Sequence, residues 1–212
     1  MRDFPVFTTE NGVGSLVLKE IPYSGIAYIT IRDTSFPEDF LQECCEFCTA
    51  VGAQRIFASG HKILESYPIH TSVVRMSAPM DIFPETDACL FPVTEQTLSQ
   101  WQEIYNQKMQ YVDNASYMSN LAAKEMLKRG DGYFIHKDDC LLGIGIAADD
   151  RIDCIASVLP GKGKEILCAL ASALFCDRVQ LEVASTNSRA IRLYESAGFI
   201  KTAEVSRWHK IF

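Results

Sequence analysis

The segment that decides the fold reads LEVASTNSRAIRLYESAGF and covers residues 181–199. It begins inside an apolar run that is typical of a strand, and Asn187 then stands where a helix N-cap would accept a hydrogen bond from the amide of Ala190. Apolar residues recur at helical spacing as far as Gly198, a residue type that commonly closes a helix. In order, the segment predicts a strand at 179–184, a helix at 187–197 and a final strand near 202–209.

Upstream of this segment the pattern predicts three strands in close order and then a helix. The strands are expected at 132–136, 140–147 and 151–159, separated by acidic turns. The glycine-rich stretch PGKGK at 160–164 leads into a helix with one apolar face. Lysines at a helix N-terminus oppose the helix dipole, so Lys162 and Lys164 make most sense with an anion bound among them. An ordinary flexible surface loop is the alternative interpretation.

The first 89 residues predict a shorter arrangement of similar kind. Strands are expected at 14–19, 25–32, 55–59 and 71–76, and a helix at 35–52 begins with a capping box formed by Ser35 and Glu38. Residues 27–59 repeat the strand, helix and strand of residues 152–185 with elements of nearly equal length. The loop of the first copy, at 33–37, carries no glycine, and the helix before its last strand is nearly missing.

A proline-containing connector at 79–87 separates the two parts. The pattern restarts with a strand at 90–93, a helix from Thr94 that carries Trp101 on its apolar stripe, and a second helix at 116–129 that Gly130 caps. The sequence therefore predicts two domains, 1–89 and 90–212.

Composition excludes several classes of protein. The net charge is 20 − 27 = −7, with 48% hydrophobic and 22% charged residues, as in a globular protein and unlike a disordered chain. The acidic balance disfavours nucleic-acid binding. No apolar run approaches the roughly 18 residues of a membrane span, and the start lacks the layout of a signal peptide, so a cytoplasmic protein with no membrane partner is expected.

Eight cysteines invite a metal or disulfide interpretation, which their spacing does not support. Cys44, Cys45 and Cys48 share one helical stretch, the other five are scattered, and no histidine stands at ligand spacing from a cysteine. We expect all eight to be buried reduced thiols, and we expect no metal site.

The deciding segment resembles the end of GCN5-related N-acetyltransferases, which typically read N..A..LYE..GF between a strand and a final strand. Val158-Leu159-Pro160 followed by Gly161-Lys162-Gly163 resembles the V-x-P segment and pyrophosphate loop of that superfamily. The usual Q/R-x-x-G-x-G/A signature is altered, since Pro160 stands three residues before Gly163 and Glu165 two residues after it. The resemblance implies an α/β (α+β) fold with a mixed, mostly antiparallel central sheet flanked by helices. Residues 90–212 would form the complete acetyltransferase domain, and residues 1–89 a degenerate half of the same kind.

The same resemblance implies an acetyl-CoA-dependent N-acetyltransferase. Its cofactor-binding residues would be the following: Ser157, Val158, Gly161, Lys162, Gly163, Lys164, Asn187 and Tyr194. Tyr194 would protonate the departing thiolate, although it could equally be a packed core aromatic. Asp153 and Glu182 are the candidate general bases, and solvent-facing positions on strands are their alternative interpretation.

The sequence does not identify the acetyl acceptor, and it is compatible with both an active enzyme and an inactive protein. A small-molecule or peptide amine is expected, and the acidic net charge favours a cationic one. A catalytically inactive acyl-CoA-binding protein, or a purely structural one, would also explain the altered loop. The oligomeric state is not predicted.

Overall fold

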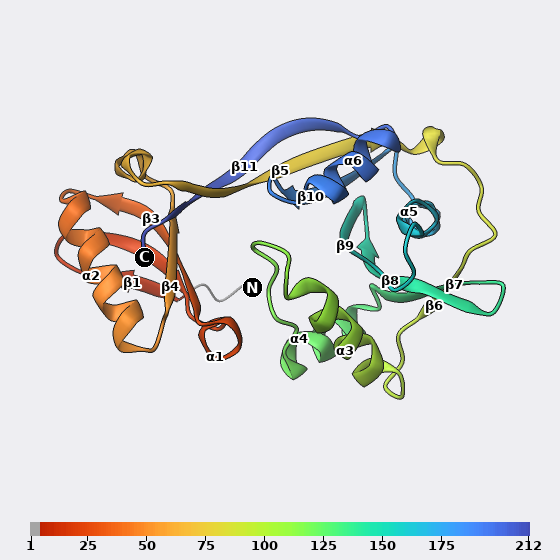
Figure 1. The fold of residues 1–212 in the computed structure, drawn as a ribbon, viewed down its shortest axis with the longest axis horizontal. Coiled ribbons are helices and arrows are strands. Elements are labelled where there is room, and N and C mark those ends of the chain that lie inside the picture. Colours follow the sequence, from red (N-terminus) through yellow and green to blue (C-terminus); the bar gives the residue numbers. More distant parts are fainter. Residues whose placement is uncertain (1–4) are drawn as a thin grey trace. The chain divides into compact units, whose positions relative to one another are not determined.

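The computed structural model describes residues 5–212, and the chain divides into two compact units (Figure 1). The first unit runs to Val73 and also takes in Glu204–Phe212, whereas the second comprises Val74–Ala203. The connector at 79–87, where the sequence analysis placed the boundary, lies inside the second unit. Two long strands, β5 (Ile69–Pro79) and β11 (Ile200–Lys210), each contribute residues to both units.

In the first unit the strand order is β1-β2-β3-β4-β11. The strands β1 (Val6–Thr8), β2 (Gly12–Val17) and β3 (Ile26–Thr34) are antiparallel neighbours. The next strand, β4 (Arg55–Ser59), runs parallel to β3, and the end of β11 pairs with β4 in the antiparallel sense. Where a simple turn was expected after β2, the short helix α1 (Ile21–Ser24) ends at Gly25, whose φ of +70° suits glycine.

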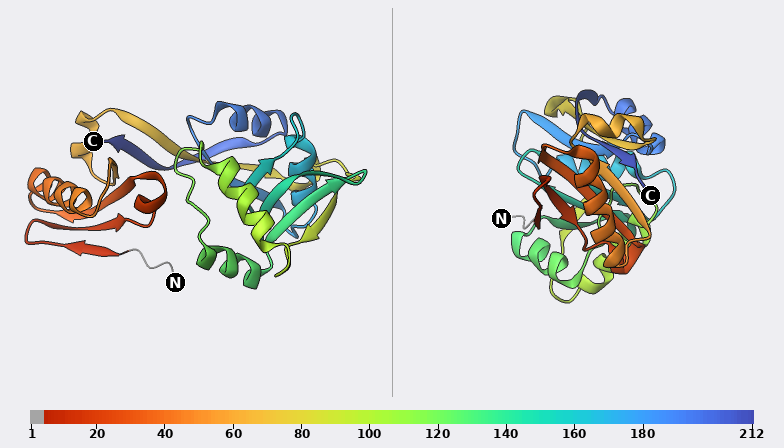
Figure 2. Two further views of the ribbon diagram at one scale, coloured as in Figure 1. Left: turned by 60° about the horizontal axis from the view of Figure 1, so that its bottom comes forward. Right: turned by 90° about the vertical axis from the view of Figure 1, so that its left-hand side faces the viewer.

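One helix, α2 (Pro37–Ala50), packs on the sheet of the first unit (Figure 2). Its buried residues Phe40, Leu41, Cys44 and Cys48 form a core with the inward side chains of β3 and β4. The predicted capping box at Ser35 is wrong. The N-cap is Phe36, with no side-chain cap, and its amide donates to Thr34 Oγ1 at 3.2 Å.

The second unit contains a longer sheet in the order β6-β7-β8-β9-β10-β5. Its first four strands form an antiparallel meander: β6 (Cys89–Pro92), β7 (Gly132–Lys137), β8 (Cys140–Ala148) and β9 (Arg151–Ser157). The strand β10 (Arg178–Ala184) is parallel to β9. On its other side lies β5, as the Arg75–Glu182 and Arg178–Ser77 contacts show.

Four helices and two hydrophobic clusters complete the second unit. One cluster holds α3 (Leu98–Met109) and α4 (Asn120–Arg129), where Trp101 Nε1 donates to the Tyr133 carbonyl at 3.0 Å. The other holds α5 (Gly163–Ala171) and α6 (Ser188–Ser196). A Cβ at Gly145 would stand 2.4 Å from Leu170 Cδ1, so this glycine allows α5 to lie close against β8. Both α3 and α4 begin about four residues later than predicted, because Thr97 is the N-cap residue of α3 and Ser119 that of α4.

The predicted repeat is confirmed, because β3-α2-β4 and β9-α5-β10 are both strand, helix and parallel strand. Two 3₁₀ helices occupy connections: η1 (Lys62–Ser66) stands before β5 where the second copy has α6, and η2 (Met80–Ile82) follows β5. The predicted degeneration of the first copy therefore includes the loss of a full helix before its last strand.

The structure bears on three features that the sequence raised: the cysteines, membrane-spanning helices and metal ligands. All eight cysteines are free, but the prediction that all are buried is wrong, because Cys89 on β6 and Cys140 on β8 are exposed and Cys45 and Cys176 are half-buried. Among residues 5–212, none of the helices combines the length and the hydrophobicity that crossing a membrane requires. The same described residues contain no group of three or more His, Cys, Asp or Glu side chains placed to hold a metal ion.

Candidate functional site

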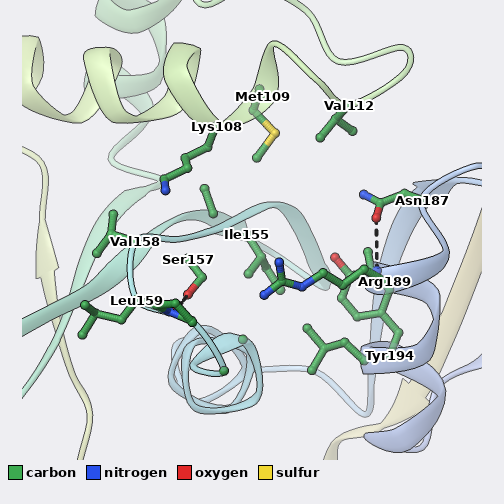
Figure 3. A pocket seen from close by; sticks show the side chains of 16 residues that line it. Lys108, Met109, Val112, Ile155, Ser157, Val158, Leu159, Asn187, Arg189 and Tyr194 are labelled. Atoms are coloured by element: carbon green, nitrogen blue, oxygen red, sulfur yellow. Dashed lines mark hydrogen bonds between the residues drawn. The ribbon is translucent and has the colours of Figure 1, made fainter.

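A cavity of about 440 Å³ lies in the second unit beside the end of β9 (Figure 3). Its walls come from the last turn of α3, the end of β9, the loop at 158–161 and the first two turns of α6. Ser157, Val158, Gly161, Gly163, Asn187 and Tyr194, all predicted from the sequence to bind the cofactor, line this cavity. Segments far apart in the chain are therefore brought together here, as expected from the sequence.

The cavity lies beyond the short stretch over which β9 and β10 are paired. Their parallel register covers two residue pairs, Gln180↔Arg151 and Leu181↔Ile152, and within the described residues it does not continue toward Ser157. In the first unit the corresponding strands β3 and β4 stay paired from Ile26↔Arg55 to Thr30↔Ser59. Only the second copy thus opens its sheet at this position.

The opened edge of β9 presents backbone hydrogen-bonding groups. The amide of Val158 donates to the Leu142 carbonyl at 2.9 Å, so Val158 bonds toward β8. Because such bonds alternate along an antiparallel strand, Ala156 also bonds toward β8, whereas Ile155 and Ser157 direct their N–H and C=O groups away from it. The backbone of Ile155 and Ser157, and not that of Val158, is therefore available to a ligand.

The glycines of the loop at 158–163 have different roles. Gly161 has a φ of +81°, and a Cβ there would meet no atom within 4 Å, so the loop is open at this point. A Cβ at Gly163 would stand 2.8 Å from Leu193 Cδ2, so this glycine serves the packing of α5 against α6. Of the two, Gly161 is the one that leaves room for close approach of a ligand.

The lysines of the loop do not face the cavity. Lys162 Nζ donates to Glu165 Oε1 at 2.6 Å, and Lys137 Nζ lies 3.7 Å from Glu165 Oε2. The hydrogen bond from Lys162, followed by the charges of both lysines, lowers the pKa of Glu165. Neither Lys162 nor Lys164 lines the cavity. The loop therefore holds an internal carboxylate in the first turn of α5, the position that otherwise favours a bound anion.

Tyr194 is the one phenol on the cavity wall of the described chain. It is 9% exposed, its ring packs against Phe199 at a centroid distance of 5.8 Å, and it points from α6 toward the cavity (Figure 3). Burial, and secondarily the neighbouring Cys154, raise the pKa of Tyr194 well above its ordinary value. Its hydroxyl is therefore protonated at neutral pH and can donate a hydrogen bond.

Asn187 combines a structural bond with a position on the cavity wall. Its Oδ1 accepts from the amide of Ala190 at 3.1 Å, which is the predicted N-cap of α6. Figure 3 shows the side-chain nitrogen of Asn187 on the cavity side of this bond. The cap thus fixes the amide group on the cavity wall.

The two candidate bases lie outside the cavity wall. Glu182 forms an ion pair with Arg75 at 2.8 Å, and Asp153 forms one with Arg151 at 2.9 Å. In the part of the chain that the structure describes, the lining of the cavity includes no Asp or Glu. A proton acceptor supplied by a protein carboxylate is therefore not part of this arrangement.

Two cations on the cavity wall were not found from the sequence. Lys108 is in the last turn of α3 and Arg189 is in the first turn of α6. Figure 3 shows both side chains extending toward the end of β9. Arg189 lies within the deciding segment, two residues after Asn187, but nothing in its spacing links it to Lys108, because only the fold brings α3 and α6 to one cavity.

Comparison with family models and with curated protein sequences finds no match. Solved structures do match over nearly the whole chain. A conserved protein of unknown function from Staphylococcus epidermidis has a TM-score of 0.60 at 11% identity, covering 99% of this chain and 94% of its own. A GCN5-related N-acetyltransferase from Anabaena variabilis has a TM-score of 0.60 at 13% identity, covering 94% of this chain and 59% of its own.

A tandem GNAT protein from the clavulanic acid biosynthesis pathway has a TM-score of 0.54 at 10% identity, covering 94% of this chain and 78% of its own. The chain has the fold of GCN5-related N-acetyltransferases. The predicted α/β (α+β) class, with a mixed and mostly antiparallel sheet, is thereby confirmed, as are the two units of acetyltransferase-like topology. At 10–13% identity these likenesses establish the fold alone.

Proposed function

We propose that this protein is an acetyl-CoA-dependent N-acetyltransferase whose donor site is the cavity of the second unit. The observation that carries the proposal is the separation of β9 from β10 after two residue pairs, which exposes the backbone of Ile155 and Ser157 to a cavity that Tyr194 also lines. A thioester donor needs both features, namely backbone donors for its carbonyl oxygen and an acid for its departing sulfur.

The residues that line the cavity suit an acyl thioester carried on the narrow, polar pantetheine arm of coenzyme A. The edge of β9 offers alternating amides and carbonyls to such an arm, Asn187 offers its side-chain amide, and Gly161 leaves the loop open. The first amides of α5 have no partner within the helix and could meet a phosphate. When bound, acetyl-CoA supplies an acetyl group activated as a thioester.

The chain's own groups would act at two atoms. The Ser157 or Ile155 amide would donate to the thioester oxygen as negative charge develops there, and the Tyr194 hydroxyl would donate to the sulfur as the C–S bond breaks. The acceptor amine must attack as the neutral base. Because none of the described residues that line the cavity is a carboxylate, the proton of the amine would pass to water rather than to Asp153 or Glu182.

The direct test is a titration followed by a turnover assay. Acetyl-CoA should raise the melting temperature, since a ligand bound only by the folded state adds about 2.7 kcal/mol of stability at a hundredfold excess over Kd. A panel of amines should then be screened for acetyl-CoA-dependent release of free thiol. No shift at millimolar acetyl-CoA contradicts the proposal.

A non-catalytic acyl-CoA-binding protein is the second candidate. It is favoured by the lack of a carboxylate among the described residues of the cavity wall and by Glu165, which occupies the first turn of α5. Binding of acetyl-CoA without thiol release from any amine in the panel would support this candidate over the enzyme.

A further inference from the structure

The cavity wall carries positive charge that no described residue neutralises. Lys108 and Arg189 come from different helices, both side chains are exposed, and neither forms an ion pair with another residue of the described chain. Figure 3 shows the Lys108 ammonium above Val158 and the Arg189 guanidinium extended toward Ser157. Two cations therefore flank the end of β9, where the proposed function places the acyl group.

This charge is opposite to that of the protein as a whole. The chain has a net charge of −7, yet the cavity lining includes two cations and, within the described residues, no carboxylate. The loop lysine Lys162 is neutralised by Glu165, so positive charge at the site is concentrated at Lys108 and Arg189. An ammonium ion that brings no negative group with it would be repelled from this place.

We propose that the acceptor is a free amino acid, whose carboxylate binds Lys108 and Arg189 while its amine faces the thioester. The proposal rests on the proposed function and names its substrate class. Arginine suits this task because its planar guanidinium can bind a carboxylate through two parallel hydrogen bonds. Every amino acid carries an α-carboxylate, which the two cations attract, together with the α-amine that reacts.

The same cations would favour the neutral form of the acceptor amine. A positive charge near an ammonium group disfavours its protonated form and lowers its pKa. An amine held beside Lys108 and Arg189 would therefore lose its proton to water more readily than in solution. The sequence-based expectation of a cationic acceptor rested on the charge of the whole chain, whereas the charge lining the cavity favours a carboxylate.

The experiment compares each of the twenty amino acids with its carboxamide, which keeps the amine and side chain but lacks the negative charge. With acetyl-CoA as donor, at least one amino acid should show a kcat/KM at least tenfold above that of its carboxamide. Arg189→Gln and Lys108→Gln should each reduce this ratio at least fivefold. Arg192→Gln, on the exposed side of the same helix, and Lys124→Gln, on α4, are matched controls that should leave it unchanged.

A binding measurement makes the test independent of turnover. In calorimetry with CoA present, the N-acetyl derivative of the preferred amino acid should bind, and its carboxamide should bind at least tenfold more weakly. If no turnover is seen, no preferred amino acid is known, and all twenty N-acetyl amino acids are then screened for binding. If none binds at millimolar concentration, the inference is wrong, while the acetyl-CoA titration reports separately on the proposed function.

Two further outcomes would overturn the inference by assigning the cations to the donor. One is an increase in the acetyl-CoA Kd in Arg189→Gln or Lys108→Gln with an unchanged preference for amino acids. The other is a succinyl-CoA Kd well below that of acetyl-CoA, with the difference abolished by either substitution, because the carboxylate would then belong to the acyl group.

Discussion

At the scale of the residue, the proposed chemistry depends most on the Tyr194 hydroxyl. Tyr194→Phe keeps the ring that packs on Phe199 and removes only the proton donor. We expect kcat to fall by about 10²- to 10⁴-fold, the usual range for acid–base catalysis, with the acetyl-CoA Kd nearly unchanged. Tyr111→Phe, which removes the hydroxyl of an exposed loop residue, is the control and should leave kcat unchanged. A Tyr194→Phe enzyme that keeps most of its kcat would remove this residue from the mechanism.

Glu165 is the second residue for which we expect a measurable effect, here on the affinity for acetyl-CoA. Its carboxylate lies in the first turn of α5 and holds Lys162 at 2.6 Å. Glu165→Gln should strengthen acetyl-CoA binding by about two- to fivefold, because it removes a negative charge from the helix N-terminus and frees the lysine. Calorimetry measures the change, with Glu125→Gln on α4 as the control. Unchanged or weaker binding would mean that Glu165 supports the loop instead of opposing an anion.

At the scale of the element, α6 is held at the cavity by its cap. Asn187→Ala removes the acceptor of the Ala190 amide and should lower the free energy of unfolding by about 0.5–2 kcal/mol, measured in urea. Asn187→Ser keeps a cap and should recover most of this stability. Both variants should bind acetyl-CoA more weakly, since both lose the side-chain amide. A serine variant with full affinity would reduce Asn187 to a structural role.

Elements were more predictable from the sequence than their ends and contacts. The strand at 55–59 matches β4 at both ends, because its apolar run is bounded by clear breaks. The start of α2 was predicted wrongly, since Thr34 rather than Ser35 binds the amide that precedes the helix. The lining cations were missed for a different reason. Lys162 is paired with Glu165 one helical turn further on, whose other carboxylate oxygen lies 3.7 Å from Lys137. Lys108 lines the cavity only because the tertiary fold places α3 beside the end of β9.

At the scale of the whole molecule, buried thiols predict how stability depends on pH. Burial raises the pKa of Cys44, Cys48 and Cys154 to about 12 and that of Cys45 to about 11, from an ordinary 9.0. The folded state therefore retains thiol protons that the unfolded chain releases near pH 9. This contribution to stability is complete below pH 9 and is lost as the pH rises toward these raised values.

Under reducing conditions the melting temperature should accordingly be level between about pH 7 and 8 and fall steadily above about pH 9. Replacing the exposed Cys89 and Cys140 by serine should leave this profile unchanged. A melting temperature that stays constant through about pH 10.5 would contradict the assignment of these thiols to the folded core.

The two repeats allow the broadest prediction. They share a topology, and they differ in whether their two parallel strands separate. The first keeps β3 and β4 paired and has η1 in place of a helix, while the second separates β9 from β10 beside Tyr194. Hydrogen–deuterium exchange with and without acetyl-CoA tests this difference directly. We predict slower exchange at 155–166 and 187–194 and no change at 27–66. Protection of the first repeat instead, or of neither repeat at saturating acetyl-CoA, would contradict this prediction.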